Sequence, residues 1–138
     1  MPQATATSHP SPAPDPVDEI YQLLQGWMDA CHGVDAEKYM SYYSESLTYL
    51  NVAIKDFGTI TYDDFNTNTH DDFRQEGCDI EFNLFFISPD GKSVAIEGTY
   101  NTRNRSGRQV SILIAIILEI QNGKIVRQTD YLDGGFLK

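Results

Sequence analysis

The C-terminal half of the chain is a succession of strand-length segments separated by short turns. The segments are CDIEFNLFFIS, SVAIEGTYNTR, RQVSILIAIILEI and IVRQTDYLD, and the turns between them are SPDGK, NRSG and QNGK. The turns are rich in Gly, Asn, Asp and Ser, which supply positive φ angles and local side-chain hydrogen bonds. Because such short connections join neighbouring strands as hairpins, residues 78–133 are predicted to form an antiparallel meander. The rest of the chain then has to cover one face of that sheet.

The N-terminal half supplies helices for this purpose. Apolar residues recur at helical spacing from Val17 to Met28, and Gly33 is expected to end this helix. A second helix is predicted over AEKYMSYYSE with Asp35 as its N-cap, a strand over SLTYLNVAI, and a third helix over TYDDFNTNTHDDFRQEG. The predicted fold class is therefore α+β, with three N-terminal helices packed in a curved, mostly antiparallel sheet.

The start of the chain has a different composition. Residues 1–16, MPQATATSHPSPAPDP, contain five of the six prolines and one charged residue. Such a segment cannot supply an apolar face or a continuous helix, so we predict a disordered leader followed by one domain over residues 17–138. No segment has the length of a transmembrane helix or the pattern of a secretory signal.

Charge and cysteine content narrow the function classes. There are 10 Lys and Arg against 20 Asp and Glu, which gives a net charge of -10 and disfavours nucleic acids and anionic membranes as partners. Cys31 and Cys78 have no C-x-x-C spacing that would suggest zinc or a redox pair, so we expect buried, reduced thiols. Without a membrane span or secretory signal, we expect a reducing, cytoplasmic compartment. The acid pairs at residues 63–64 and 71–72 lack neighbouring Cys and are expected to be solvated, so no metal or other cofactor is predicted.

The order of predicted elements, ending in GKIVRQTDYLD, resembles a cone-shaped superfamily. It includes nuclear transport factor 2, ketosteroid isomerase, SnoaL-like polyketide cyclases, scytalone dehydratase and limonene epoxide hydrolase. The Asp-Tyr-x-Asp at residues 130–133 is similar to the SnoaL-like and limonene epoxide hydrolase branch of this NTF2-like superfamily. The resemblance implies a cone-shaped fold with a deep pocket on the inner sheet face. It also implies homodimerisation through the outer face, which would use alternate residues of SILIAIILEI.

Two enzymes of this superfamily fit the sequence poorly. Where ketosteroid isomerases have a tyrosine on the first helix and an aspartate base on the first strand, this chain has Trp27 and Asn51. An indole only donates a hydrogen bond, and an amide cannot take a proton near neutral pH. Scytalone dehydratase uses paired histidines, whereas His32 and His70 are expected to be structural.

Limonene epoxide hydrolase resembles the chain more closely. Its water-holding tyrosine, asparagine and aspartate correspond to Tyr49, Asn51 and Asp130, which implies that Asp130 is a base and the other two orient the nucleophile. Strand alternation places Tyr49 and Asn51 on one face. The family's arginine and acid aspartate fall on Glu97 and Thr99. Thr99 cannot protonate an epoxide oxygen, so Glu97 is the predicted acid, paired with Asp130 in the pocket.

Structural roles for these residues remain open alternatives. Asp130 could form a salt bridge with Arg103 or Arg127. The tyrosine could be a half-buried strand aromatic, the asparagine a turn residue, and the glutamate an ordinary exposed strand acid.

Apolar side chains are expected to line most of the pocket, which favours a small apolar ligand with few charges. The expected substrate-binding residues are Trp27, Tyr43, Thr99, Phe82, Phe86, Ile112 and Ile114. The predicted function is a cofactor-independent cyclase or isomerase of secondary metabolism. It would open an epoxide, or rearrange a ring, of a polyketide or terpenoid intermediate by acid/base catalysis. Hydrolysis by water, dehydration and non-catalytic binding are the alternatives.

Overall fold

The computed structural model describes residues 15–53 and 58–133, which form one mixed sheet of six strands and three helices. The predicted leader, residues 1–16, lies almost entirely outside the described residues. In chain order the elements are α1 (Pro16–His32), α2 (Ala36–Met40), β1 (Tyr43–Asn51), β2 (Thr59–Thr61), α3 (Tyr62–Gln75), β3 (Ile80–Ile87), β4 (Ser93–Arg103), β5 (Gln109–Gln121) and β6 (Lys124–Leu132). This α+β composition is the predicted one.

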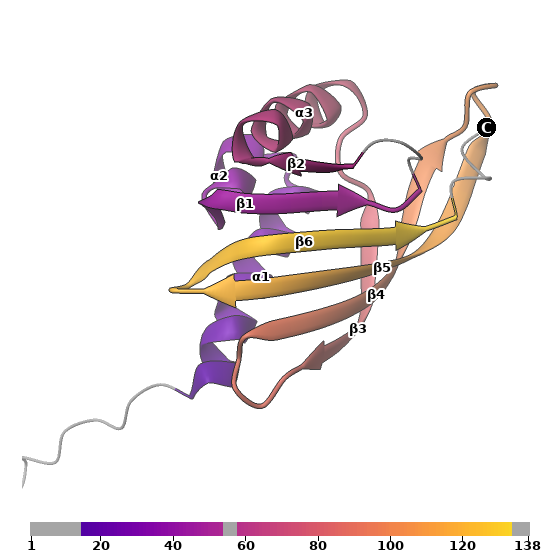
Figure 1. Ribbon diagram of the computed structural model, residues 1–138. Helices are drawn as coiled ribbons and strands as arrows, with labels where there is room; N and C mark the ends of the chain where they lie inside the picture. Colours follow the sequence, from indigo (N-terminus) through magenta and orange to yellow (C-terminus); the bar gives the residue numbers. More distant parts are fainter. Residues whose placement is uncertain (1–14, 54–57, 134–138) are drawn as a thin grey trace, which may run out of the picture.

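The sheet has the strand order β2-β1-β6-β5-β4-β3 and is curved (Figure 1). Strands β3 to β6 form the predicted antiparallel meander. The turns between them have positive φ angles at Gly91, Gly107, Asn122 and Gly123, as the turn chemistry requires. Among the described strands, β1 and β6 alone pair in parallel, and this pairing places residues 49–51 beside residues 128–130. The pairing of β1 with β6 therefore brings together the two segments that contain the predicted residues Tyr49, Asn51 and Asp130.

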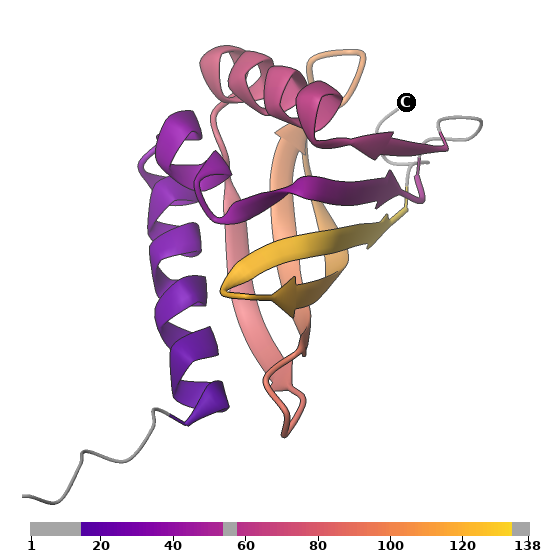
Figure 2. The same ribbon diagram turned by 60° about the vertical axis from the view of Figure 1, so that its left-hand side comes forward.

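Helix α1 begins at the boundary of the predicted leader. The Asp15 carboxylate accepts a hydrogen bond from the backbone N–H of Val17 at 2.8 Å, and Pro16 lies in the first turn. Both features favour a helix N-terminus, so the helix starts slightly before the predicted domain. Figure 2 shows α1 alongside the sheet, where it contacts β3.

Helix α2 is shorter than predicted. It ends at Met40, and Tyr43, which we expected on this helix, is the first residue of β1. The reason is non-local: Ile125 of β6 donates its backbone N–H to the Tyr42 carbonyl at 2.9 Å and pairs with Tyr43. Sheet pairing thus overrides the helical pattern. The short strand β2, which pairs with β1, was not predicted.

A register shift in β3 changes which side chains face the core. It lies between Phe82 and Leu84, opposite Gly98, where a Cβ atom would approach the Glu81 carbonyl oxygen to 2.4 Å. Beyond this bulge the facing of the strand is inverted, so Phe86 is 62% exposed on the outer face. The prediction that Phe82 and Phe86 share one lining face is therefore wrong.

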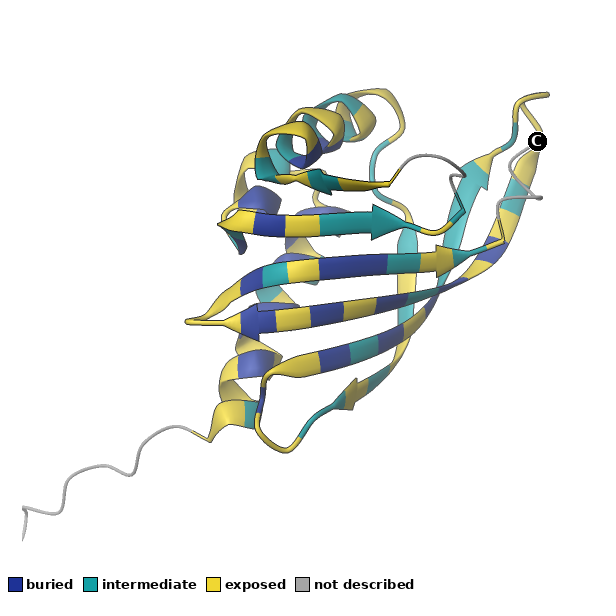
Figure 3. Ribbon diagram, viewed as in Figure 1, coloured by how far each residue is buried: buried dark blue, intermediate teal, exposed yellow. Residues whose placement is uncertain are grey.

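The core lies between the helices and one face of the sheet (Figure 3). Its fully buried side chains include Leu24 and Trp27 from α1, Ile96 from β4 and Leu118 from β5. On β5 buried residues alternate with more exposed ones, which identifies an inner and an outer face of the sheet. Within the described residues no helix is long and apolar enough to cross a membrane.

Both cysteines of the chain form a disulfide. Cys31, near the end of α1, is bonded to Cys78, just before β3, with 5.2 Å between their Cα atoms. The prediction of reduced thiols is therefore wrong, because the fold brings together two cysteines that are 47 residues apart. This bond does not support the expected cytoplasmic location, because disulfides persist mainly in oxidising compartments.

Reduction of this disulfide should destabilise the protein. We expect a reducing agent to lower the free energy of unfolding by roughly 2–5 kcal/mol, because the bond closes a long loop in the unfolded chain. Urea denaturation with and without reductant measures the change. A Cys31→Ala/Cys78→Ala variant is the control and should be insensitive to the reductant. Equal midpoints for the oxidised and reduced protein would contradict a structural role for the bond.

Candidate functional site

A cavity of about 170 Å³ lies among the inner face of the sheet, α2 and α3. Of the predicted site residues, it brings together Tyr49 and Asn51 of β1, Asp130 of β6 and Ile114 of β5. The parallel pairing of β1 with β6 positions the first three, since Asn51 is directly beside Asp130 and Tyr49 beside Gln128. This part of the predicted site therefore forms a common wall.

Two neutral groups hold the Asp130 carboxylate. The Tyr49 hydroxyl donates to Oδ2 at 2.6 Å, and the Gln128 side-chain amide donates to Oδ1 at 2.9 Å. The alternative of a salt bridge is wrong among the described residues: Arg127 lies 3.9 Å from Glu119, and Arg103 donates to the Gly107 carbonyl.

Burial raises the pKa of the Asp130 carboxyl above its usual range. The hydrogen bonds from Tyr49 and Gln128 oppose this effect because they stabilise the ionised form. The pKa of the Tyr49 hydroxyl is also raised, mainly by burial and then by the nearby Asp130 charge, so this phenol stays protonated as a donor. The pKa of Asp130, and with it the ability of this carboxylate to accept a proton, thus depends on its burial and on its two hydrogen bonds.

A buried hydrogen-bonded chain extends from Asp130 to α1. Gln128 accepts from the Tyr43 hydroxyl at 2.5 Å, and Tyr43 accepts from the Trp27 indole N–H at 2.9 Å. The Tyr39 hydroxyl lies 2.9 Å from that of Tyr43. Because Tyr43 has a single proton, its donation to Gln128 keeps the amide oxygen toward Tyr43 and the amide nitrogen toward Asp130.

Asn51 has a less direct place in the cavity wall. Its side-chain oxygen accepts a hydrogen bond from the backbone N–H of Ala53 at 3.0 Å, at the end of β1. The predicted turn role and the cavity position are thus compatible, because this bond fixes the amide where it lines the cavity.

The predicted acid Glu97 is not in the cavity. Asp130 pairs with Ile116, and Ile116 with Ile96, so these three residues share the inner face. Glu97 is the next residue along β4, and its exposed side chain is on the outer face. Thr99, two residues further, has the same outward facing. The predicted Glu97–Asp130 pair is therefore wrong.

Several other expected lining residues lie behind the cavity wall rather than at its surface. Trp27 is 1% exposed, and Tyr43, like Trp27, acts through the hydrogen-bonded chain. Phe82 packs on Trp27 with 5.3 Å between ring centroids, and Ile112 is buried without lining the cavity. Of the predicted apolar lining, only Ile114 reaches the cavity.

Helix α3 supplies a cavity wall that the sequence analysis missed. Phe65, Thr69, Asp72 and Phe73 line the cavity, and their spacing of four, three and one residues places them on one helical face. That spacing was a usable signal. The acid pair at residues 71–72 is predicted to be solvated, and Asp72 is indeed exposed, but it also lines the cavity. Partial burial, followed by the charges of Glu76 and Asp71, raises the pKa of the Asp72 carboxyl.

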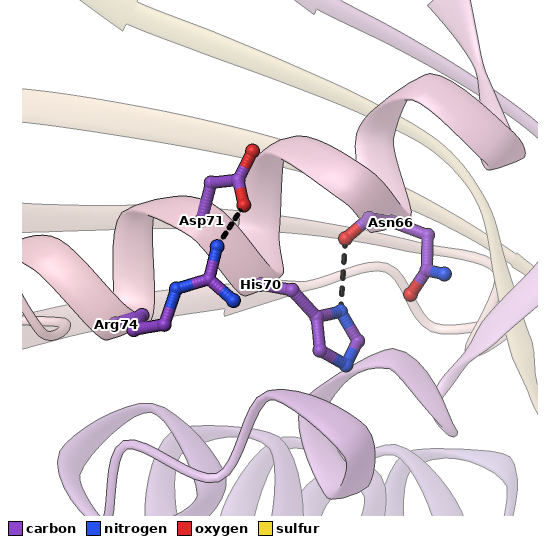
Figure 4. A network of polar contacts seen from close by, with 4 residues as sticks. All are labelled: Asn66, His70, Asp71 and Arg74. Carbon is purple, nitrogen blue, oxygen red and sulfur yellow. Dashed lines mark hydrogen bonds and ion pairs between the residues drawn. The ribbon is translucent and has the colours of Figure 1, made fainter.

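The histidines have structural partners, as predicted. His32 Nε2 lies 2.7 Å from the Ile80 carbonyl oxygen, and His70 Nδ1 lies 2.9 Å from the Asn66 carbonyl oxygen (Figure 4). On the same helix Arg74 pairs with Asp71. In the part of the chain that the structure describes, no group of His, Cys, Asp and Glu is arranged to hold a metal ion.

A second, larger hollow of about 530 Å³ adjoins the first and shares Gly77 and Tyr100 with it. Its wall is mostly polar and includes Asp79, Asn101 and Ser111. Asn101 bonds to both Asp79 and Ser111, at 3.2 and 2.6 Å. Since these groups satisfy one another, we place the candidate site in the smaller cavity, which contains the partly buried Asp130 carboxylate.

Comparison with known proteins finds structures of similar fold at low sequence identity. No protein-family model and no curated protein matches the chain. Among solved structures, a limonene epoxide hydrolase-like epoxide hydrolase from M. tuberculosis is similar, with a TM-score of 0.70, 19% identity and coverage of 87% of this chain and 86% of that one. An NTF2-like protein from Burkholderia thailandensis has a TM-score of 0.73 at 18% identity, covering 86% and 93%.

A third similar structure is a hypothetical protein of ketosteroid isomerase-like fold from Catenulispora acidiphila, in complex with trimethylamine. Its TM-score is 0.66 at 18% identity, with 80% of this chain and 84% of that chain covered. At such low identities the likeness concerns the fold. The arrangement of helices and sheet described above is therefore that of the NTF2-like proteins, and this chain has the NTF2-like fold.

Proposed function

We propose that the protein is a cofactor-independent enzyme that uses Asp130 as a general base on a small, largely apolar molecule. The observation that carries this proposal is a cavity with a carboxylate in its wall, held at 2.6 Å by a protonated tyrosine. A base needs a defined position and a proton affinity suited to its task, and both are set here by Tyr49 and Gln128. An open cavity favours an enzyme over a binding module, the alternative from the sequence.

The reaction that this arrangement favours is the opening or rearrangement of an electrophilic ring such as an epoxide. Asp130 takes the proton of a nucleophilic O–H while Asn51 and Tyr49 orient it. The nucleophile forms a bond to a ring carbon, the carbon–oxygen bond breaks, and the released oxygen needs a proton. Because Glu97 lies on the outer face, we assign the acid to Asp72, the other carboxyl group that lines the cavity, whose pKa is raised by partial burial and by the charges of Glu76 and Asp71.

The proposed substrate is a natural-product intermediate, and the nucleophile distinguishes the alternatives. A hydroxyl of the substrate itself makes the enzyme a cyclase or isomerase, whereas water makes it a hydrolase like the M. tuberculosis protein of the same fold. A dehydration would use the same carboxylates. The arginine of the hydrolase family has no counterpart among the described residues that line the cavity, and the proposed acid comes from α3 instead of β4; these differences favour the cyclase or isomerase.

We also propose a homodimer formed through the outer sheet face. This face carries exposed apolar side chains from three strands: Leu84 and Phe86 of β3, Leu113 of β5 and Tyr131 of β6. Such a group of large apolar residues on one face is a feature of interaction surfaces.

The proposed mechanism predicts different effects of mutating two acids of the sheet, Asp130 and Glu97. Asp130→Asn should lower kcat/KM for epoxide opening by about 100-fold or more, because an amide cannot accept the proton. Glu97→Gln should leave it unchanged, because Glu97 lies on the other face of the sheet. Turnover of a panel of terpenoid and aromatic epoxides, followed by mass spectrometry in labelled water, measures both variants. Full activity of Asp130→Asn, or a comparable loss in Glu97→Gln, would refute the assignment.

The pH profile should reveal the role of Gln128. Its amide stabilises ionised Asp130 and so lowers the pKa of this carboxyl, and the Gln128→Leu variant should raise it again. Because the base acts when ionised, the acidic limb of the kcat/KM profile should move to higher pH by about one unit. Gln22→Leu, an exposed position on α1, is the matched control and should keep the original profile. An unshifted limb in a folded Gln128→Leu variant is the contrary result.

Charge on the outer face should prevent dimer formation. Leu113 is 77% exposed, and Leu113→Glu should give a monomer in sedimentation experiments at concentrations where the unchanged protein is dimeric. Tyr21→Glu, at an exposed position on α1, is the control and should remain dimeric. A monomeric unchanged protein would argue against the proposed dimer.

A further inference from the structure

The cavity around Asp130 combines acidic and aromatic side chains. Its wall contains the carboxylates of Asp72 and Asp130 and the rings of Tyr39, Tyr49, Phe65, Phe73 and Tyr100. Among the described residues that line it there is no Lys, Arg or His. Among the described residues that line the cavity, an ionised Asp130 therefore has no positively charged side chain to balance it.

Within the described part of the chain, the hydrogen-bond partners of the Asp130 carboxylate are neutral. Its two oxygens accept from a phenol and an amide, at 2.6 and 2.9 Å. The ion pairs Arg74–Asp71 and Arg127–Glu119 involve other acids, on the surface of α3 and the outer sheet face. A buried carboxylate is stable in its charged form only with a compensating charge or several donors. A cationic ligand would provide that charge inside the cavity.

The aromatic rings suit the same kind of ligand. They come from four elements, α2, β1, α3 and β4. Their mutual packing fixes them, with 4.5 Å between the Tyr49 and Phe65 centroids and 5.1 Å between those of Tyr39 and Phe73. Aromatic cages of this kind recognise alkylammonium groups, whose charge is spread over an apolar surface.

The volume limits the size of the group. The cavity holds about 170 Å³, whereas an apolar cavity of roughly 150 Å³ accommodates benzene. A trimethylammonium head or a protonated cyclic amine is therefore of suitable size.

We propose that the cavity binds the alkylammonium group of an otherwise apolar ligand, with the Asp130 carboxylate as its counterion and the surrounding aromatic rings as its cage. This inference rests on the proposed function for the location of the site and adds the chemical class of the substrate. It also has a consequence for catalysis: a cation beside Asp130 favours the ionised carboxylate, so the substrate itself would help to prepare the base.

Choline and its neutral isostere, in which a carbon atom replaces the nitrogen, provide the test. Trp27 is the only tryptophan of the chain, and Tyr43 and Gln128 connect it to Asp130, so its fluorescence reports binding. Calorimetry gives an independent Kd. We expect choline to bind at least about tenfold more tightly than the isostere. Asp130→Asn should abolish this preference, whereas Asp64→Asn, which removes an exposed charge of α3, should retain it.

The pH dependence of binding provides a second measurement. The titratable groups facing Asp130 are Tyr39 of α2, Tyr43 and Tyr49 of β1, Tyr100 of β4 and, across the cavity, Asp72 of α3. Burial raises the pKa of all four phenols, so they stay neutral in the working range. The choline affinity should therefore rise with pH as Asp130 ionises, and this rise should persist in Asp72→Asn and vanish in Asp130→Asn.

Three results would overturn the inference: equal affinities for choline and the isostere, a preference that survives in folded Asp130→Asn, or no saturable choline binding in the millimolar range. The proposed function is judged separately, by epoxide turnover in Asp130→Asn. Loss of turnover without ammonium preference refutes the ligand class alone. Ammonium preference with turnover unchanged by the mutation refutes the catalytic role of Asp130 and leaves a binding site.

Discussion

The partly buried Asp130 carboxylate, which has no basic partner among the described residues, is the constraint on which the site depends. A charged or protonated carboxyl in such a place needs donors, and Tyr49 and Gln128 supply them. Gln128 in turn keeps its orientation because its oxygen accepts from Tyr43, which is held by Trp27. Residues of α1, β1 and β6 therefore together determine the position and the pKa of the Asp130 side chain.

The parallel pairing of β1 with β6 makes this arrangement possible. In an otherwise antiparallel sheet, it places Tyr49 beside Gln128 and Asn51 beside Asp130. Helix α3 then closes the cavity with one face, and the disulfide fixes the chain just after that helix to the end of α1, with Cys78 itself in the cavity wall. Non-local contacts thus hold together the structural elements that enclose the cavity. The cavity between them is lined by carboxyl groups and aromatic rings.

Much of the fold was predictable because its signals are local. Turn residues mark the meander, helical spacing marks α1 and α3, and the element order pointed to the NTF2-like fold. The site was predictable only in part. Residues on one strand, such as Tyr49 and Asn51, share a face by alternation alone. Glu97 and Asp130 lie on different strands, and their relative facing depends on the register, which places Ile96 and not Glu97 in the row of Asp130. A bulge beside Gly98 similarly reversed the facing of Phe86.

The sequence by itself determined the strands, turns and helices, the acidic character of the chain, and the candidates Tyr49, Asn51 and Asp130. Only the tertiary structure decided that Tyr43 belongs to a strand, that Cys31 and Cys78 are bonded, that Asp72 faces the cavity and that Glu97 does not. The physical reason is common to all four. Each depends on the pairing or packing of segments distant in the sequence, and no local pattern specifies which side of one element meets which side of another.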